Sequence, residues 1–160
     1  MNFVEQMKTK AKDLQRRLVL PEGTEPRTIQ AARQLVDERL AAVVTLVGPD
    51  AAVREAAQTA GVDLSGVTVL DPSGAEHRER YAKEYHELRK HKGLSPEEAH
   101  EQIIEPLRWG AMMVRLGDAD AMVARDEARE KPTAVRLDDL GGGCLEHGDE
   151  LVVFLSEIER

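Results

Sequence analysis

A short run of cations is the part of this sequence whose residue types best fit a chemical role, the segment Glu87-Leu88-Arg89-Lys90-His91-Lys92-Gly93. Arginine and lysine stabilise anions, and the planar guanidinium of Arg89 is able to grip a phosphate through two parallel hydrogen bonds. The same run also fits the last turn of a helix, where cations suit the helix dipole and a glycine ends the helix. Residue types alone favour this second, structural interpretation.

Other motifs that are catalytic in some proteins give weaker indications here. The run Gly141-Gly142-Gly143 lacks the lysine and hydroxyl residue of a phosphate-binding loop, so we interpret it as a flexible connection. Cys144 has no histidine at a recognisable spacing, and a lone cysteine is usually inert. Of the five histidines, only His86 and His91 are close in sequence, and they miss the i, i+4 spacing of a helical metal site. We predict no metal site and assign no catalytic residue.

Composition places the chain among acidic globular proteins. Its 160 residues carry a formal net charge of -8, and only 3% of them are aromatic, so aliphatic side chains must fill the core. An acidic field repels nucleic acid and anionic lipid, so we expect neither a nucleic-acid partner nor a membrane. The single cysteine suits a reducing compartment, and the charged amino terminus lacks the apolar centre of a signal peptide. We expect a cytoplasmic protein.

Apolar runs alternate with amphipathic stretches along most of the chain. Short apolar segments bounded by turn residues predict four strands, at residues 18–20, 42–47, 67–70 and 119–123. Helical spacing and capping residues predict helices that begin near residues 24, 50 and 75 and at Ser95, and a stretch over 103–116 interrupted near Pro106. Parallel strands joined by helices predict an α/β fold, a three-layer α/β/α sandwich with a mainly parallel sheet.

The two ends of the chain differ from this pattern. The first segment should be an amphipathic helix whose apolar face lies on the sheet as a lid, formed by Phe3, Val4, Met7, Ala11 and Leu14. Residues 125–131 are almost entirely charged, and an apolar strand candidate follows at residues 151–155.

A series of segments up to about Val123 resembles the amino-terminal part of the phosphate acetyltransferase family (phosphate acetyl/butyryltransferases). The most specific segment is the Glu87 to Gly93 string with Tyr85 before it. The others, in chain order, are Leu18-Val19-Leu20-Pro21-Glu22-Gly23, Arg27-Thr28, Val47-Gly48, Asp71-Pro72, Met112-Met113-Val114, Leu116-Gly117 and Ala119-Asp120.

This resemblance implies transfer of an acetyl group between acetyl phosphate and coenzyme A, by direct attack of the thiolate. Coenzyme A is then a substrate, and no metal or prosthetic group is required. The implied fold resembles the first of the two domains of the isocitrate and isopropylmalate dehydrogenases, with the active site between the domains and usually a homodimer. Arg89 matches the family arginine that lines this cleft and binds a substrate phosphate, and we place Lys90 and Lys92 in the same substrate-binding site.

Departures from the family pattern are also evident. Ala124-Arg125-Asp126-Glu127 stands where the family has a serine-glycine loop, and the family's active-site serine, second and third arginines and aspartate have no counterpart. We therefore predict a truncated member, with a family-like domain over residues 1–124. Residues 125–160 form an unassigned tail that completes the sheet if residues 151–155 form an edge strand.

Three functional interpretations remain open. The first is a phosphate acetyltransferase-like enzyme whose incomplete active site makes it slow or inactive. The second is a non-catalytic remnant that binds an acyl phosphate or coenzyme A, or pairs with a full-length relative. The third is an α/β domain without a ligand. The sequence specifies neither the preferred acyl chain nor the oligomeric state.

Overall fold

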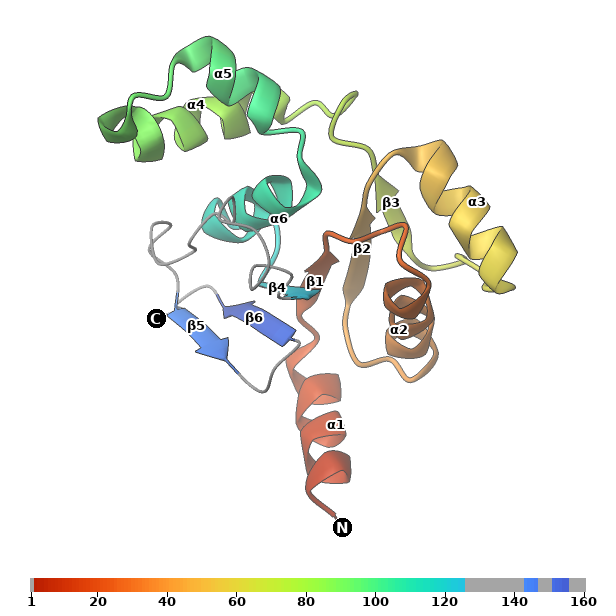
Figure 1. The fold of residues 1–160 in the computed structure, drawn as a ribbon. Helices are drawn as coiled ribbons and strands as arrows, with labels where there is room; N and C mark the ends of the chain where they lie inside the picture. Colours follow the sequence, from red (N-terminus) through yellow and green to blue (C-terminus); the bar gives the residue numbers. More distant parts are fainter. Residues whose placement is uncertain (1, 126–142, 147–150, 156–160) are drawn as a thin grey trace.

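The structure is a computed structural model and describes residues 2–125, 143–146 and 151–155. A sheet with helices on both of its faces forms the body of the molecule (Figure 1). Four of its strands are parallel to one another: β1 (Arg17–Leu20), β2 (Val43–Val47), β3 (Thr68–Leu70) and β4 (Ala121–Arg125).

The order of the strands across the sheet is β3-β2-β1-β4-β6-β5. β1 is central, and it pairs with β2 on one side and with β4 on the other. β6 (Leu151–Leu155) pairs antiparallel with β4, and β5 (Gly143–Glu146) pairs antiparallel with β6. The division of the chain into residues 1–124 and 125–160 stays a prediction.

Side chains of the central strands pack into two separate hydrophobic cores, one on each face of the sheet. This is expected when helices cover both faces of a parallel sheet. Leu20, Val44 and Leu46 pack with α2 (Pro26–Asp37) and α3 (Asp50–Ala60). Val19 and Val47 pack on the other face, in a cluster built mainly from α4 (Arg78–Arg89), α5 (Pro96–Gln102) and α6 (Pro106–Arg115). The predicted α/β sandwich with a mainly parallel sheet is confirmed.

Helix α6 begins where the sequence suggested only an interruption. The predicted stretch over 103–116 is interrupted near Pro106 as expected, but only its part from Pro106 to Arg115 is α6, because α5 already ends at Gln102. Glu105 is the N-cap, and its carboxylate accepts hydrogen bonds from the backbone N–H groups of Leu107 and Arg108, each at 3.1 Å. Proline has no N–H to lose, so it suits the first position of a helix. This start places Arg108 in the first turn of α6.

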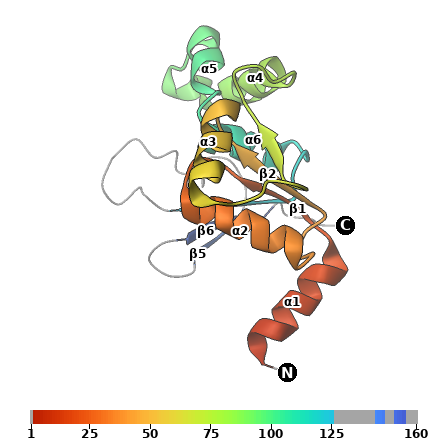
Figure 2. The same cartoon turned by 90° about the vertical axis from the view of Figure 1, so that its right-hand side faces the viewer.

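Helix α1 (Phe3–Leu14) does not form the predicted lid. It projects away from the body of the molecule (Figures 1 and 2), and none of its residues is buried. Phe3 is 72% exposed and Leu14 is 48% exposed. The helix ends at Gln15, whose positive φ of 45° turns the chain sharply into β1, and Lys8 pairs with Glu38 at 2.5 Å. The helical period was predicted correctly, but its apolar face is not covered by the described residues.

Replacing Phe3 with serine should therefore change the free energy of unfolding by no more than about 0.5 kcal/mol, because an exposed side chain gains little on folding. Urea denaturation followed by circular dichroism measures this. The matched core change is Ile29→Val on α2, where Ile29 is fully buried, and it should cost about 1 kcal/mol. A loss above 1 kcal/mol in Phe3→Ser would contradict the exposed position of α1.

Candidate anion-binding site

Helix α6 approaches the sheet closely at the centre of the fold. In open α/β sheets, ligands bind beyond the carboxyl ends of the strands, where neighbouring connections leave in opposite directions. The strand order places that point between β1 and β4. Gly110 allows the close approach, because a Cβ atom there would lie 2.8 Å from Met122 Sδ and 3.6 Å from Pro21 Cβ. The first turn of α6 is thereby fixed next to the strand ends.

Arg89 is the last residue of α4 and is partly buried. Its guanidinium carbon Cζ lies 5.9 Å from the centroid of the Tyr85 ring, one helical turn earlier. Tyr85 is buried, and its hydroxyl donates a hydrogen bond to Gln102 Oε1 at 3.3 Å. A cation is attracted to the face of an aromatic ring, so Tyr85 holds the Arg89 head group in place.

Lys90 and Lys92 follow Arg89 directly in the chain. They belong to a short 3-10 helix, η1 (Lys90–Lys92), which ends at Gly93 with a φ of 84°. Lys90 Nζ lies 2.5 Å from Glu87 Oε2, and this hydrogen bond holds the pKa of Glu87 below its usual range. Both lysines are exposed. The helix end carries the cations that the dipole favours, and the assignment of Arg89, Lys90 and Lys92 to a substrate site stays a prediction.

A second guanidinium, that of Arg108, lies close to the same aromatic ring. Its Cζ atom is 6.0 Å from the Tyr85 centroid, and its Nη1 atom is 3.6 Å from Glu105 Oε2. Among the described residues, its buried Nε atom has no hydrogen-bond partner. No motif in the sequence pointed to Arg108. The one available signal was Pro106, because a proline at the first helical position places the residue two positions later in the first turn.

Two other polar clusters connect elements of the fold. The Tyr81 hydroxyl donates a hydrogen bond to Asp118 Oδ2, and Arg80 pairs with the same oxygen at 3.0 Å. Burial raises the pKa of Tyr81, and the hydrogen bond to Asp118 raises it further, so the phenol stays protonated. This cluster joins α4 to the turn after α6.

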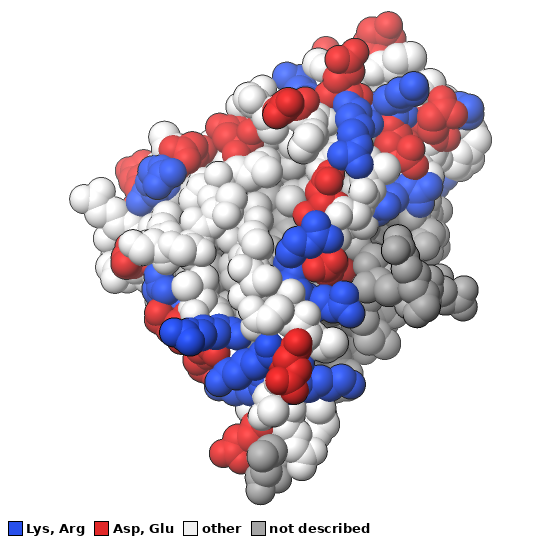
Figure 3. Space-filling view, turned by 180° about the vertical axis from the view of Figure 1, so that it is seen from behind, with Lys and Arg blue, Asp and Glu red and all other residues white. Residues whose placement is uncertain are grey.

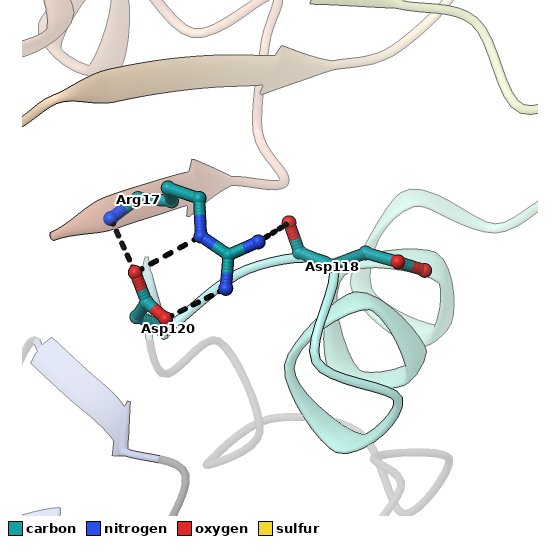
Figure 4. A network of polar contacts seen from close by, with 3 residues as sticks. All are labelled: Arg17, Asp118 and Asp120. Atoms are coloured by element: carbon teal, nitrogen blue, oxygen red, sulfur yellow. Dashed lines mark hydrogen bonds and ion pairs between the residues drawn. The ribbon is translucent and has the colours of Figure 1, made fainter.

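The second cluster joins the starts of β1 and β4 (Figure 4). Arg17 donates to Asp120 from Nε at 3.1 Å, from Nη2 at 2.8 Å and from its backbone N–H at 2.7 Å, and Nη1 donates to the Asp118 carbonyl at 3.3 Å. The guanidinium holds the pKa of Asp120 below its usual range. Because these groups lie at the amino ends of the strands, opposite the candidate site, they fix the sheet and do not act on a ligand.

Charges of both signs are interspersed on the face shown in Figure 3, around a broad uncharged area. Among the described residues, no group of three or more His, Cys, Asp or Glu side chains is arranged to hold a metal. In the same part of the chain, no helix is both long enough and apolar enough to cross a membrane. Gly141, Gly142 and His147 lie outside the described residues, as does the side chain of Cys144.

Comparison with known proteins decides the family. A family model described as phosphate acetyl/butaryl transferase matches residues 2–135. The chain belongs to this family. The match ends beyond Val123, the residue at which the resemblance in the sequence stopped.

Relatives with this family's activity in their names share the amino-terminal part of the chain. A phosphate acetyltransferase of Treponema pallidum (strain Nichols) is 47% identical over 127 residues, which are 79% of this chain and 38% of that relative. A phosphate acetyltransferase of Thermoanaerobacterium thermosaccharolyticum is 40% identical over 124 residues, which are 78% of this chain and 37% of that relative. The chain therefore spans well under half of the length of these relatives.

Solved structures support the fold. A EutD phosphotransacetylase from Staphylococcus aureus aligns with a TM-score of 0.74 at 22% identity, over 95% of this chain and 50% of that one. A phosphotransacetylase from Streptococcus pyogenes aligns with a TM-score of 0.70 at 23% identity, over 88% of this chain and 41% of that one. At these identities the likeness concerns the fold alone.

Proposed function

We propose that this chain takes part in acyl transfer between acetyl phosphate and coenzyme A, with Arg89 binding a phosphoryl group. The observation that carries the proposal is the family match over residues 2–135. The names of the relatives support acetyl as the acyl group. Coenzyme A is a substrate in this proposal, and no cofactor takes part. The cytoplasmic location and the homodimer stay predictions.

The chemistry of the proposed reaction accounts for an arginine at the position that binds the phosphoryl group. Attack of the coenzyme A thiolate on the acyl carbon forms a C–S bond, and the C–O bond to phosphate breaks with its electron pair on the leaving phosphate. Negative charge grows on that phosphate, and a guanidinium already in position stabilises it through two parallel hydrogen bonds. Lys90 and Lys92 are proposed to supply flanking positive charge from the same helix end.

A second candidate function for the 160-residue polypeptide is binding of the same anions without turnover, in an active site that is incomplete, or pairing with a full-length relative. The observation that favours it is that this polypeptide matches only 38% of the length of the Treponema pallidum relative. A domain without any ligand is the third outcome that the experiment must separate.

The test is acetylation of coenzyme A from acetyl phosphate by the purified chain, followed through thioester absorbance. Arg89→Ala should lower kcat/KM about ten- to hundredfold, because a hydrogen bond to a charged group contributes roughly 1.5–3 kcal/mol. The matched control is Arg115→Ala, since Arg115 lies at the other end of α6 and pairs with Glu84 at 2.7 Å. This control should keep its activity.

The outcomes separate the candidates. Turnover that Arg89→Ala leaves unchanged would contradict the role of Arg89. Saturable binding of acetyl phosphate or coenzyme A without turnover, lost in Arg89→Ala, favours the non-catalytic function. A folded chain whose melting temperature responds to neither compound is a domain without a ligand.

A further inference from the structure

We infer that Arg108 is a second guanidinium of the Arg89 site, and that the two side chains together bind one phosphoryl group. The inference rests on the proposed function, from which it takes the class of ligand. It adds a residue of α6 to a site that the sequence placed only at the end of α4.

The first argument is the shared aromatic ring. The Cζ atoms of Arg89 and Arg108 lie 5.9 Å and 6.0 Å from the centroid of Tyr85. Tyr85 is 3% exposed, and its hydroxyl is bound to Gln102 at the end of α5. The ring is therefore a buried support approached from α4 and α6 by two cations that lie nineteen positions apart in the sequence.

The second argument is the hydrogen-bonding capacity of Arg108 that the described residues leave unused. Both oxygens of Glu105 already accept backbone N–H groups of the α6 cap, at 3.1 Å each. The remaining contact, from Arg108 Nη1 to Glu105, is 3.6 Å, which is too long for a hydrogen bond. Other arginines of this protein have closer acidic partners, at 2.7 Å or 2.8 Å for Arg17, Arg33, Arg54 and Arg115.

The third argument is electrostatic. Two guanidinium groups on one ring repel each other, and an anion held by both offsets that repulsion. The Arg108 side chain is 20% exposed although its Nε atom is buried, so part of the side chain is open to a ligand. A phosphoryl group with two or more anionic oxygens presents enough acceptors for two planar guanidinium forks. Acyl phosphates and coenzyme A both carry such a group.

Calorimetric titration of the purified chain with inorganic phosphate and with coenzyme A tests the inference. Arg108→Gln and Arg89→Gln should each raise Kd about tenfold for at least one of these ligands. Arg115→Gln, the same change two turns further along α6, should leave Kd within about twofold. A loss confined to inorganic phosphate assigns the pair to the acyl phosphate, and a loss confined to coenzyme A assigns it to that substrate.

Different failures have different meanings. If Arg89→Gln weakens binding and Arg108→Gln does not, the inference is overturned and the proposed function stands. If the unchanged chain binds neither ligand, or if Arg89→Gln has no effect, both are overturned. Arg108→Lys keeps the charge without the planar fork, so it replaces Arg108→Gln if that variant does not fold. It should then bind more weakly than the unchanged chain.

Discussion

Trp109→Ala should lower the free energy of unfolding by about 3–5 kcal/mol, because it opens a large cavity in the core. Trp109 is fully buried on α6, and its ring centroid lies 4.6 Å from that of Tyr81 on α4. The same cluster includes Val19 and Val47 of the sheet, so the indole ring joins two helices to the strands. Urea denaturation followed by far-ultraviolet circular dichroism is the appropriate measurement, since the change removes the protein's single tryptophan.

The matched variant is Trp109→Phe, which should cost at least 2 kcal/mol less than Trp109→Ala. Phenylalanine refills most of the cavity. Both variants remove the indole N–H, which is buried without a hydrogen-bond partner among the described residues, so the difference between them reports the cavity. An unmet buried donor costs about 1–3 kcal/mol, and its removal offsets part of the lost packing. Equal losses in the two variants would contradict this account of the core.

Asp120→Ala should lower the free energy of unfolding at pH 7 by about 2–3 kcal/mol. Three donors of Arg17 lose their acceptor, and charge-assisted hydrogen bonds are the stronger class. We expect no larger value, because the Arg17 side chain is 43% exposed and solvent screens its charge. Asp37→Ala is the control, since Asp37 is 63% exposed in its pair with Arg33 and should cost less than 1 kcal/mol.

This loss should depend on pH. The pKa of Asp120 is lowered in the folded chain by its hydrogen bonds to Arg17, so the carboxylate stabilises the fold above its unfolded pKa of about 3.9. That contribution disappears as the pH falls through the lower, folded pKa. The difference between the unchanged chain and Asp120→Ala should therefore shrink below about pH 4. A difference that stayed constant from pH 7 to pH 2.5 would rule out the carboxylate as its source.

Strand positions and layer order followed from the sequence because they depend on local patterns. Short apolar runs closed by turn residues gave β1 to β4, and Ser95 with Glu98 formed the capping box expected at the start of α5. Periodicity also found α1, but it cannot show what covers an apolar face. The position of α1 away from the sheet was therefore missed.

Of the two arginines near Tyr85, only Arg89 could be found from the sequence, for a related reason. Arg89 stands in a contiguous string of cations, so inspection of neighbouring residues in the sequence identifies it as a candidate. Arg108 has no such neighbours, and it reaches Tyr85 only because α6 starts at Pro106 and packs beside α4. A contact between helices far apart in sequence is set by packing, and no spacing rule encodes it.

The pairing of β1 with β4 has a consequence for synthesis of the protein. Arg17 and Asp120 are 103 positions apart, and a ribosome adding about 5–20 residues per second needs roughly 5–20 s to make that interval. During this time β2 and β3 are available to pair, while one side of β1 remains an open edge. The nascent chain should thus expose an unpaired edge of β1 until β4 emerges from the ribosome. A chaperone that binds strand edges could bind the chain during that interval.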